Sequence, residues 1–348
     1  MKTKPVLTFA LFTFNQEKFV AEAVRGALGQ TYSPLEIVIS DDYSTDSTFE
    51  VIEKEIAAYT GRHTIHLNRN TKNIGLAASI NKVMKLSRGQ LIVVAAGDDI
   101  SLPHRVEKTY QIFSRSENIV LSIYSDAIII DENGKTLSEN HVAPDPQKLT
   151  LNWLSKRLGG VLGCSHAWDR RVFDLFGPID EDVIREDVVI PFRSALVGEI
   201  RFCNEPLVLY RHHSNNKWIG ELERVRTSEE LRASLLRLSD GNVAIYKNRL
   251  RDLGIMFRLY PEQQIQLKHF ADDALKGLRE MEDERRLLLS SSVIKRTAVI
   301  LGAYWRGTSL RKLARWSLIS FLPQLYLKHK LYLPTKPRMR QQRSVEPV

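Results

Sequence analysis

Two pairs of adjacent acidic residues are the side chains of this sequence best suited to chemistry. Asp98 and Asp99 follow a glycine after an apolar run, and Glu186 and Asp187 stand together later in the chain. Two carboxylates on a tight turn can bind a hard divalent cation, which in turn neutralises a diphosphate. A single carboxylate can act as a general base towards a hydroxyl group. The other interpretation of each pair is structural, because acidic residues cap helices and are favoured in the first helical turn.

Polar residues follow three of the apolar runs in the first hundred residues. The clusters are Thr13 to Asn15, Asp41 to Asp46, and Gly97 to Asp99. If the runs are parallel strands, their carboxyl ends share one edge of a sheet, and ligands of open α/β sheets bind beyond that edge. The sequence therefore predicts one site to which all three clusters contribute.

Strand and helix patterns alternate over this part of the chain. The predicted strands are residues 6–12, 35–40, 64–68 and 90–95, and the predicted helices are residues 17–28, 49–59 and 77–86. Such alternation is typical of βαβ units. We therefore expect an α/β fold, with a mostly parallel sheet flanked by helices in the Rossmann-like manner of nucleotide-binding proteins. An Asn-Gly pair within Asp131 to Lys135 predicts a hairpin turn further along.

The stretch LFTFNQEKFVAEAVRGALGQTYSPLEIVISDDYSTDSTFEVI closely resembles the opening of family 2 glycosyltransferases with the GT-A fold. Later segments resemble further family motifs in the same order: Asn73-Ile74-Gly75 the N-x-G segment, Ala96-Gly97-Asp98-Asp99 the DxD-type element, Arg185-Glu186-Asp187 the E-D motif, and Tyr210-Arg211-His212-His213 the closing Tyr-Arg-x-His. Five ordered motifs are far more specific than any one. The resemblance implies a GT-A catalytic domain over residues 1–216, of the type that builds bacterial cell-surface polysaccharides.

The resemblance assigns a nucleotide-binding role to residues of the first two clusters. It implies that Phe12, Thr13 and Phe14 line the base and that Asp42 accepts a hydrogen bond from it. An imide N–H of a pyrimidine would satisfy that carboxylate, which favours a UDP or dTDP sugar over a guanine nucleotide. Phe12 and Phe14 replace the usual proline and tyrosine of the family, and a phenyl face still allows stacking. The remaining donor contacts are assigned by the resemblance to Asn73, Gly75 and Asp98.

The resemblance also assigns metal and base. Asp99 is expected to bind a divalent metal, Mn²⁺ or Mg²⁺, with His213 as a third ligand; a packing role for His213, or ligation by His212 instead, stays open. Asp187 is the expected general base of an inverting transfer, and Glu186 would position it or bind the acceptor. The alternative for both acidic residues is a helix N-terminal charge pair.

A third stretch, Gly163 to Trp168, falls where related enzymes shape the acceptor site. Trp168 could stack on a sugar ring, although a large aromatic residue is more often part of a core. For Cys164 we expect a packing role. Neither this cysteine nor Cys203 lies in a spacing typical of a zinc or redox site.

The remaining residues, 217–348, are expected to form a helical C-terminal region. Residues 229–238 and 263–289 have the composition of ordinary helices, so we expect a helical cap or a dimerisation unit, the latter giving a homo-oligomer. The net charge of the whole chain is +9, and the last 58 residues carry +11 of it, so the other 290 residues sum to −2. The basic character therefore belongs to the tail.

The tail shows a partly amphipathic pattern. Its apolar stripe consists of Leu310, Leu313, Ala314, Leu318 and Phe321, with Arg311, Lys312 and Arg315 between them, while Trp316 and Ile319 fall outside the stripe. Such a segment can lie on an anionic membrane surface, and packing against the catalytic domain is the alternative. No motif typical of nucleic-acid binding accompanies the charge, so we expect no nucleic-acid partner.

Two further expectations concern location and activity. No run of about 18 apolar residues occurs, and the two cysteines suit a reducing compartment, so we expect a cytoplasmic protein, peripheral on the inner membrane if the tail binds lipid. A non-catalytic nucleotide-sugar-binding or scaffold protein on the same fold is the second hypothesis, because a fold does not guarantee activity. The presence of both Asp99 and Asp187 favours the enzyme.

Overall fold

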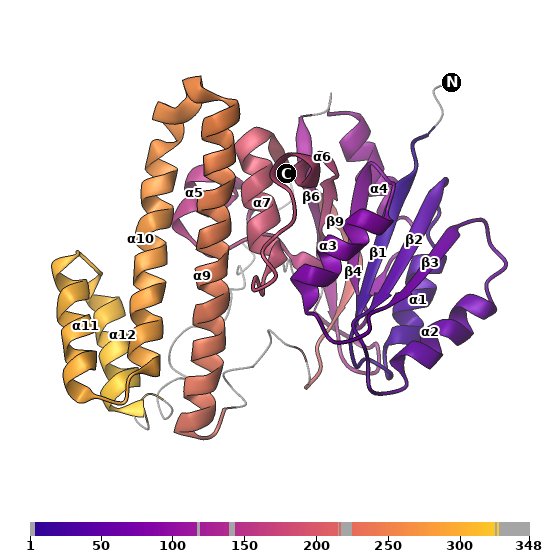
Figure 1. Cartoon of the computed structure of the whole chain (residues 1–348). Helices are drawn as coiled ribbons and strands as arrows, with labels where there is room; N and C mark the ends of the chain where they lie inside the picture. Colours follow the sequence, from indigo (N-terminus) through magenta and orange to yellow (C-terminus); the bar gives the residue numbers. More distant parts are fainter. Residues whose placement is uncertain are drawn as a thin grey trace, which may run out of the picture.

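The computed structural model describes residues 4–116, 119–138, 143–214, 216, 225–323 and 326. A twisted sheet with flanking helices forms one side of the molecule, and long helices from the C-terminal part of the chain form the other (Figure 1). Within the described residues, no helix is both long enough and apolar enough to cross a membrane.

The first part of the sheet is parallel, as the sequence predicts. Its elements are β1 (Leu7–Thr13), α1 (Val20–Leu28), β2 (Leu35–Asp41), α2 (Thr48–Ala57), β3 (Thr64–Arg69), α3 (Leu76–Leu86) and β4 (Leu91–Ala96). The strands lie in the order β3-β2-β1-β4, all parallel. Every residue of β1 and β2 is buried, which explains their nearly continuous apolar sequence. The three predicted polar clusters therefore meet at one edge.

The second part of the sheet is mixed, so the expectation of a mostly parallel sheet holds only for the first part. The strands are β5 (Ile100–Ser101), β6 (Val120–Ile130), β7 (Thr136–Ser138), β8 (Ala167–Asp169) and β9 (Glu199–Arg211). β8 joins β4 to β6 and is antiparallel to both, while β9 is parallel to β6. The predicted turn between β6 and β7 is confirmed. Gly134 there adopts a φ of +81°, which glycine tolerates without strain.

Helices cover both faces of the sheet. The remaining elements of this part are α4 (Arg105–Ser114), η1 (Pro146–Lys148), α5 (Leu151–Lys156), η2 (Gly163–Ser165), α6 (Arg171–Phe176) and α7 (Glu186–Val197). One core cluster contains buried residues of α1, α2 and α4 against one face, and a second contains those of α3, α6 and α7 against the other. The sheet is thus the middle layer of three.

The C-terminal region is helical, as predicted. It consists of α9 (Ser228–Leu259), η3 (Pro261–Gln263), α10 (Gln264–Leu289), α11 (Val293–Trp305) and α12 (Leu310–Phe321). α9 begins with a capping box, in which the Thr227 side chain accepts from Glu230 N–H and the Glu230 side chain accepts from the Thr227 N–H. α9 and α10 pack side by side, with α9 next to α7 (Figure 1).

α9 is built into the same core as the sheet. Arg193 of α7 and Asp252 of α9 form an ion pair at 2.9 Å, with both side chains fully buried. Ala244 and Leu253 of α9 belong to the cluster that covers the sheet. The division at residue 216 remains a proposal, and the hydrophobic core continues across it.

α11 and α12 pack on α10 rather than on the sheet. Leu313 and Trp316 of α12 are buried with Ala303 of α11 and Leu287 of α10. The expected lipid-facing stripe is therefore wrong at Leu313, which packs inward. Trp316, which the sequence placed outside the stripe, is also buried. Residues 327–348 of the tail lie outside the described residues.

Candidate active site

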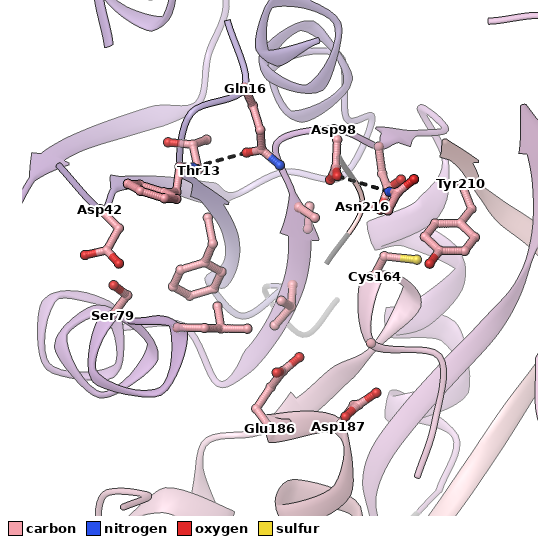
Figure 2. Close-up of a pocket in the computed structure, with 18 of the residues that line it drawn as sticks. Thr13, Gln16, Asp42, Ser79, Asp98, Cys164, Glu186, Asp187, Tyr210 and Asn216 are labelled. Carbon is pink, nitrogen blue, oxygen red and sulfur yellow. Dashed lines mark hydrogen bonds between the residues drawn. The ribbon is translucent and has the colours of Figure 1, made fainter. Parts of the chain in front are cut away.

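A single pocket of about 350 Å³ connects the edge of the sheet with the start of α7. Its lining residues come from the ends of β1, β2 and β4, from α3, from the η2 segment, from α7 and from the end of β9. Figure 2 shows Asp42 at one end of this pocket, Asp98 and Cys164 towards the other, and Glu186 with Asp187 on the wall opposite Thr13. Two of the three strand-end clusters and both acidic pairs thus face one cavity directly, and the third cluster contributes Asp42.

Asp42 is held rigidly at the end of β2. One carboxylate oxygen accepts from Asn70 Nδ2 at 2.9 Å and from the N–H of Ile74 at 2.8 Å, and the other accepts from the N–H of Gly75 at 2.8 Å. Gly75 has a φ of +83°, a conformation that disfavours any residue with a side chain. Asp42 therefore presents oriented acceptor oxygens to the pocket. Asn70 was not predicted from the sequence.

The predicted nucleotide contacts separate into two groups. Phe12, Thr13 and Phe14 all line the pocket with Asp42, and their contact with a nucleotide base remains a proposal. Asn73 is exposed and is not among the lining residues, and Gly75 acts through its bond to Asp42 rather than by lining the pocket.

The 41–46 cluster has mainly structural tasks apart from Asp42. Asp41 is fully buried, and its carboxylate accepts from the N–H of Ser44 at 2.9 Å and from Thr13 Oγ1 at 3.1 Å. Asp46 accepts from the N–H of Thr48 at 3.0 Å, at the start of α2. These bonds fix the turn that follows β2.

Asp98 and Asp99 do not cap the next helix, so that structural interpretation is wrong. α4 begins at Arg105 and has no side-chain cap. Asp99 Oδ1 accepts from the N–H of Arg211 at 2.9 Å, and Asp98 Oδ2 lies 3.0 Å from His213 Nε2 and 3.5 Å from Asn216 Nδ2. The pair is thus tied to the end of β9, and His213 contacts Asp98 rather than Asp99.

The Arg211 side chain supports the turn that carries Asp98 and Asp99. The side chain is 1% exposed and donates to the carbonyl oxygens of Asp98 at 3.0 Å and Glu132 at 2.9 Å, and it pairs with Glu22 of α1. The sequence placed Arg211 inside a motif but gave it no role. The contacts join α1, the β4 turn and β9 around one guanidinium group.

Burial disfavours the ionised form of Asp99. Burial and the neighbouring charge of Asp98 hold the pKa of the Asp99 carboxyl well above its ordinary value. The Cys164 thiol lies beside Asp99, and burial together with the charge of Asp99 raises the pKa of this thiol. Cys164 lines the pocket, as the position of its stretch suggested, although a packing role was expected for this residue. A bound cation would compensate the two carboxylates, and carboxylate oxygens are the ligands that Mg²⁺ and Mn²⁺ prefer.

Glu186 and Asp187 form the first turn of α7 and face the pocket from the opposite side. Asp187 Oδ1 is buried and has no hydrogen-bond partner within the described residues. Burial raises the pKa of Asp187 to about 6, against the lowering effect of Arg185. Burial and the charge of Asp187 raise the pKa of Glu186 to about 8. The helix N-terminus favours these acids, and that effect does not provide Asp187 Oδ1 with a partner.

Close backbone packing holds this acidic turn against the η2 segment. A side chain at Gly160 would overlap the carbonyl oxygen of Asp187, since its Cβ would lie 1.6 Å away. The N–H of Val161 donates to the same oxygen at 3.2 Å. Arg185 donates to Leu158 O at 2.9 Å and to Asn242 Oδ1 of α9 at 2.8 Å. α9 therefore helps to position the acidic pair.

Only part of the predicted acceptor stretch reaches the pocket. Gly163 and Cys164 line it, together with Tyr210, which the sequence placed in the closing motif without a role. His166 is buried, with Nε2 2.6 Å from Ser122 Oγ, and burial lowers its pKa to about 3. Trp168 is 1% exposed and packs in the core, as the more common role of a large aromatic residue suggested.

Sequence comparisons identify a family and relatives that match part of the chain. Residues 8–176 match the model of glycosyl transferase family 2. An uncharacterized glycosyltransferase of Methanocaldococcus jannaschii is 33% identical over 137 residues, which cover 39% of this chain and 46% of that protein. Another, from Nostoc, is 26% identical over 224 residues, which cover 60% of this chain and 66% of that protein. The matches thus span less than two thirds of these relatives' lengths.

Structural comparisons extend the similarity to the fold. Mannosyltransferase PcManGT from Pyrobaculum calidifontis, solved with GDP-Man and Mn²⁺, has a TM-score of 0.50 and 16% identity, covering 95% of this chain and 87% of that one. A TarS fragment of S. aureus, solved with UDP-GlcNAc, has the same TM-score and identity, covering 88% of this chain and 93% of that one. The fold is therefore of the GT-A type, and residues 8–176 match the family 2 glycosyltransferases in sequence.

Proposed function

We propose that this protein is an inverting glycosyltransferase, which moves a sugar from a nucleoside diphosphate sugar to an acceptor hydroxyl. One observation carries the proposal. The carboxylate of Asp187 has a buried oxygen without a hydrogen-bond partner among the described residues. It faces the same pocket as Asp98 and Asp99, which are held by contacts to the end of β9 and the residues after it. A diphosphate beside the tied pair and a hydroxyl beside Asp187 would lie at two sides of one cavity. Inverting displacement requires this arrangement of leaving group and base.

The base of the donor would lie at the Asp42 end of the pocket. Since Asp42 already accepts three N–H donors, it can add only another donor, such as the imide N–H of uracil or thymine. Phe12 supplies an apolar surface nearby. On the family resemblance, we favour UDP or dTDP sugars. A GDP sugar, as bound by the Pyrobaculum enzyme, is the competing donor class.

A divalent ion, Mn²⁺ or Mg²⁺, is part of the proposal. Asp98, Asp99 and His213 are the residues that would hold it, although no group of three such side chains among the described residues is arranged to hold an ion by itself. Mg²⁺ sites commonly combine one or two carboxylates with substrate phosphates, so two carboxylates suffice here. When bound, the ion neutralises charge that develops on the leaving diphosphate. The Mn²⁺ of the Pyrobaculum complex supports this choice of cofactor.

The protein's own residues would then act on the acceptor. The acceptor oxygen forms a bond to the anomeric carbon while the bond from that carbon to the diphosphate oxygen breaks, and the hydroxyl proton passes to Asp187. With its pKa raised to about 6, Asp187 is a stronger base than an ordinary aspartate and is still ionised at neutral pH. Glu186, with a pKa of about 8, retains its proton at neutral pH and can donate a hydrogen bond to a substrate oxygen.

For the acceptor, we propose a glycan or a lipid-linked glycan, in the synthesis of a cell-surface glycan such as O-antigen, capsule or lipopolysaccharide. The support is the family and the basic C-terminal region, since a lipid-linked acceptor would lie at the cytoplasmic face of the inner membrane.

The test is a thermal-shift panel of UDP, dTDP and GDP sugars, each with Mn²⁺ and with chelator, followed by transfer assays with the stabilising donor. A bound donor raises the melting temperature in proportion to RT ln(1 + [L]/Kd). We expect stabilisation by a uridine or thymidine sugar only with metal, and slow hydrolysis of that donor. Metal-dependent binding with no turnover towards water or any acceptor would support the non-catalytic nucleotide-sugar-binding protein instead.

A further inference from the structure

The outer side of α11 is apolar, although nothing in the described protein covers it. Solvent-facing positions Ile294, Ala298, Leu301 and Trp305 are spaced four, three and four residues apart. This spacing places them on one side of the helix. Ile294 is 82% exposed and Trp305 is 83% exposed. The opposite side, with Ala303, packs against α10 and α12. α11 is thus apolar on two sides, and only one of them is buried.

α12 repeats this pattern beside α11. Its exposed positions include Leu310, Ala314, Leu318 and Phe321, while Leu313 and Trp316 face inward. The two helices are neighbours in antiparallel orientation, because Arg296 near the start of α11 donates to Ser320 O near the end of α12. These two exposed stripes, residues 294, 298, 301 and 305 with residues 310, 314, 318 and 321, together form one surface, the hairpin face.

Only basic charge accompanies the hairpin face. Residues 290–323 contain six lysine or arginine residues and no acidic residue. Three of the six, Arg306, Lys312 and Arg315, pair with acidic residues of α10. Lys295 and Arg311 are exposed and follow the stripe residues Ile294 and Leu310 directly in sequence. Apolar stripes bordered by cations, with an exposed tryptophan, are typical of helices that lie in a lipid interface.

We propose that the hairpin face docks the protein on a membrane surface that contains anionic lipid. A second copy of this chain is the less suitable occupant, because two acid-free faces would bring like charges together. The chain's own last residues, 327–348, are also basic, with six lysine or arginine residues and one glutamate. Each exposed cation near an anionic surface instead adds to the attraction.

The position of the hairpin face leaves the active-site pocket free. None of the lining residues of that pocket comes from α11 or α12. The hairpin lies beyond α10, on the far side of the α9–α10 pair from the sheet (Figure 1). Docking therefore does not depend on the reaction proposed for the pocket, and each can be tested without the other.

The experiment is co-sedimentation of the full chain with phosphatidylcholine vesicles, with and without phosphatidylglycerol. We expect binding to the anionic vesicles, weaker binding at high salt, and about a tenfold loss of partitioning in Ile294→Glu. Ile265→Glu is the matched control, because Ile265 is 88% exposed at the start of α10 and the change in charge is identical. This control should bind like the wild type.

Several outcomes would overturn the proposal. Absence of wild-type binding at low salt would do so, as would equal partitioning of the two variants, which would place the binding on general charge or on residues 327–348. Light scattering of the same proteins checks the dimer: a wild-type dimer that Ile294→Glu converts to a monomer, with vesicle binding unchanged, would assign the face to a second copy. Nucleotide binding without vesicles should be equal in all three proteins, and its loss would concern the pocket only.

Discussion

The two acidic pairs of the active-site pocket differ in how many partners their oxygens already have. Asp98 and Asp99 contact His213, Asn216 and the N–H of Arg211. Glu186 and Asp187 lie at a helix start, where Asp187 Oδ1 has no partner in the described protein. A tied pair is suited to holding a ligand in a fixed place, whereas a buried oxygen without a partner is suited to receiving a proton. Substitutions should therefore separate binding at the first pair from chemistry at the second.

The largest effect is expected for Asp187→Asn. The amide keeps the shape of the side chain but cannot accept the proton, so transfer should fall by about 10² to 10⁴. Nucleotide affinity should stay close to that of the wild type. Turnover and calorimetry on the same preparation measure both. Asp182→Asn is the control, an exposed aspartate five residues upstream. Transfer at the wild-type rate would make Asp187 a structural residue of α7.

A smaller effect is expected for Asp99→Asn, in the acidic pair proposed to bind the metal and the donor. Removal of one charged ligand should weaken metal-dependent nucleotide binding by about tenfold to a hundredfold. In chelator, the variant and the wild type should bind nucleotide equally weakly. Calorimetry with UDP and Mn²⁺ gives both values. If the wild type binds nucleotide as tightly in chelator as in Mn²⁺, the metal assignment is wrong and the first pair holds the donor by other means.

The pH dependence sharpens the role of the second pair. Because burial raises the pKa of Asp187 to about 6, the base loses activity on protonation below that pH, by about tenfold per pH unit. An ordinary aspartate would keep the rate constant to about pH 4. The measurement is kcat/KM from pH 5 to pH 8, with nucleotide affinity measured at each pH to separate protonation of the first pair. A flat profile down to pH 5 would remove Asp187 from the base role.

The smallest effect concerns stability. The folded-state pKa of Glu186 is raised to about 8, so the folded protein holds this proton more tightly than the unfolded chain, and stability falls as pH rises from about 4 towards 8. Glu186→Gln cannot ionise and should exceed the wild type by about 1–3 kcal/mol at pH 9, with little difference at pH 4. Melting temperatures across this range decide it. Glu181→Gln, an exposed change of the same charge, should show no such trend.

Much of the parallel sheet could be predicted because its signals are local. Buried strands such as β1 and β2 are mostly apolar, and each is followed by polar residues where the strand ends. Both acidic pairs were also visible, since adjacent carboxylates after a glycine or before an apolar helix are uncommon. The mixed part of the sheet was not predicted, because β8 has only three residues and its pairing with β4 and β6 depends on distant strands.

The partners of the site residues could not be predicted for the same reason. Asn70 and Asp42 are 28 residues apart, and Asp99 and Arg211 are 112 residues apart, so no local spacing connects them. Cys164 looked like a packing residue because nothing near it in sequence is acidic. Its contact with Asp99 exists only because η2 packs beside the β4 turn.

The sequence by itself determined the element types, the edge at which the polar clusters meet and the identity of the two acidic pairs, because these depend on periodicity and on residues a few positions apart. Only the tertiary structure decided which side of α12 is buried, that α11 has a second apolar side, and that Asp187 has an oxygen without a partner. Burial and hydrogen bonding are properties of the neighbours that folding brings together. A helix with two apolar sides carries the same residues whichever side is covered, so the choice is made by packing.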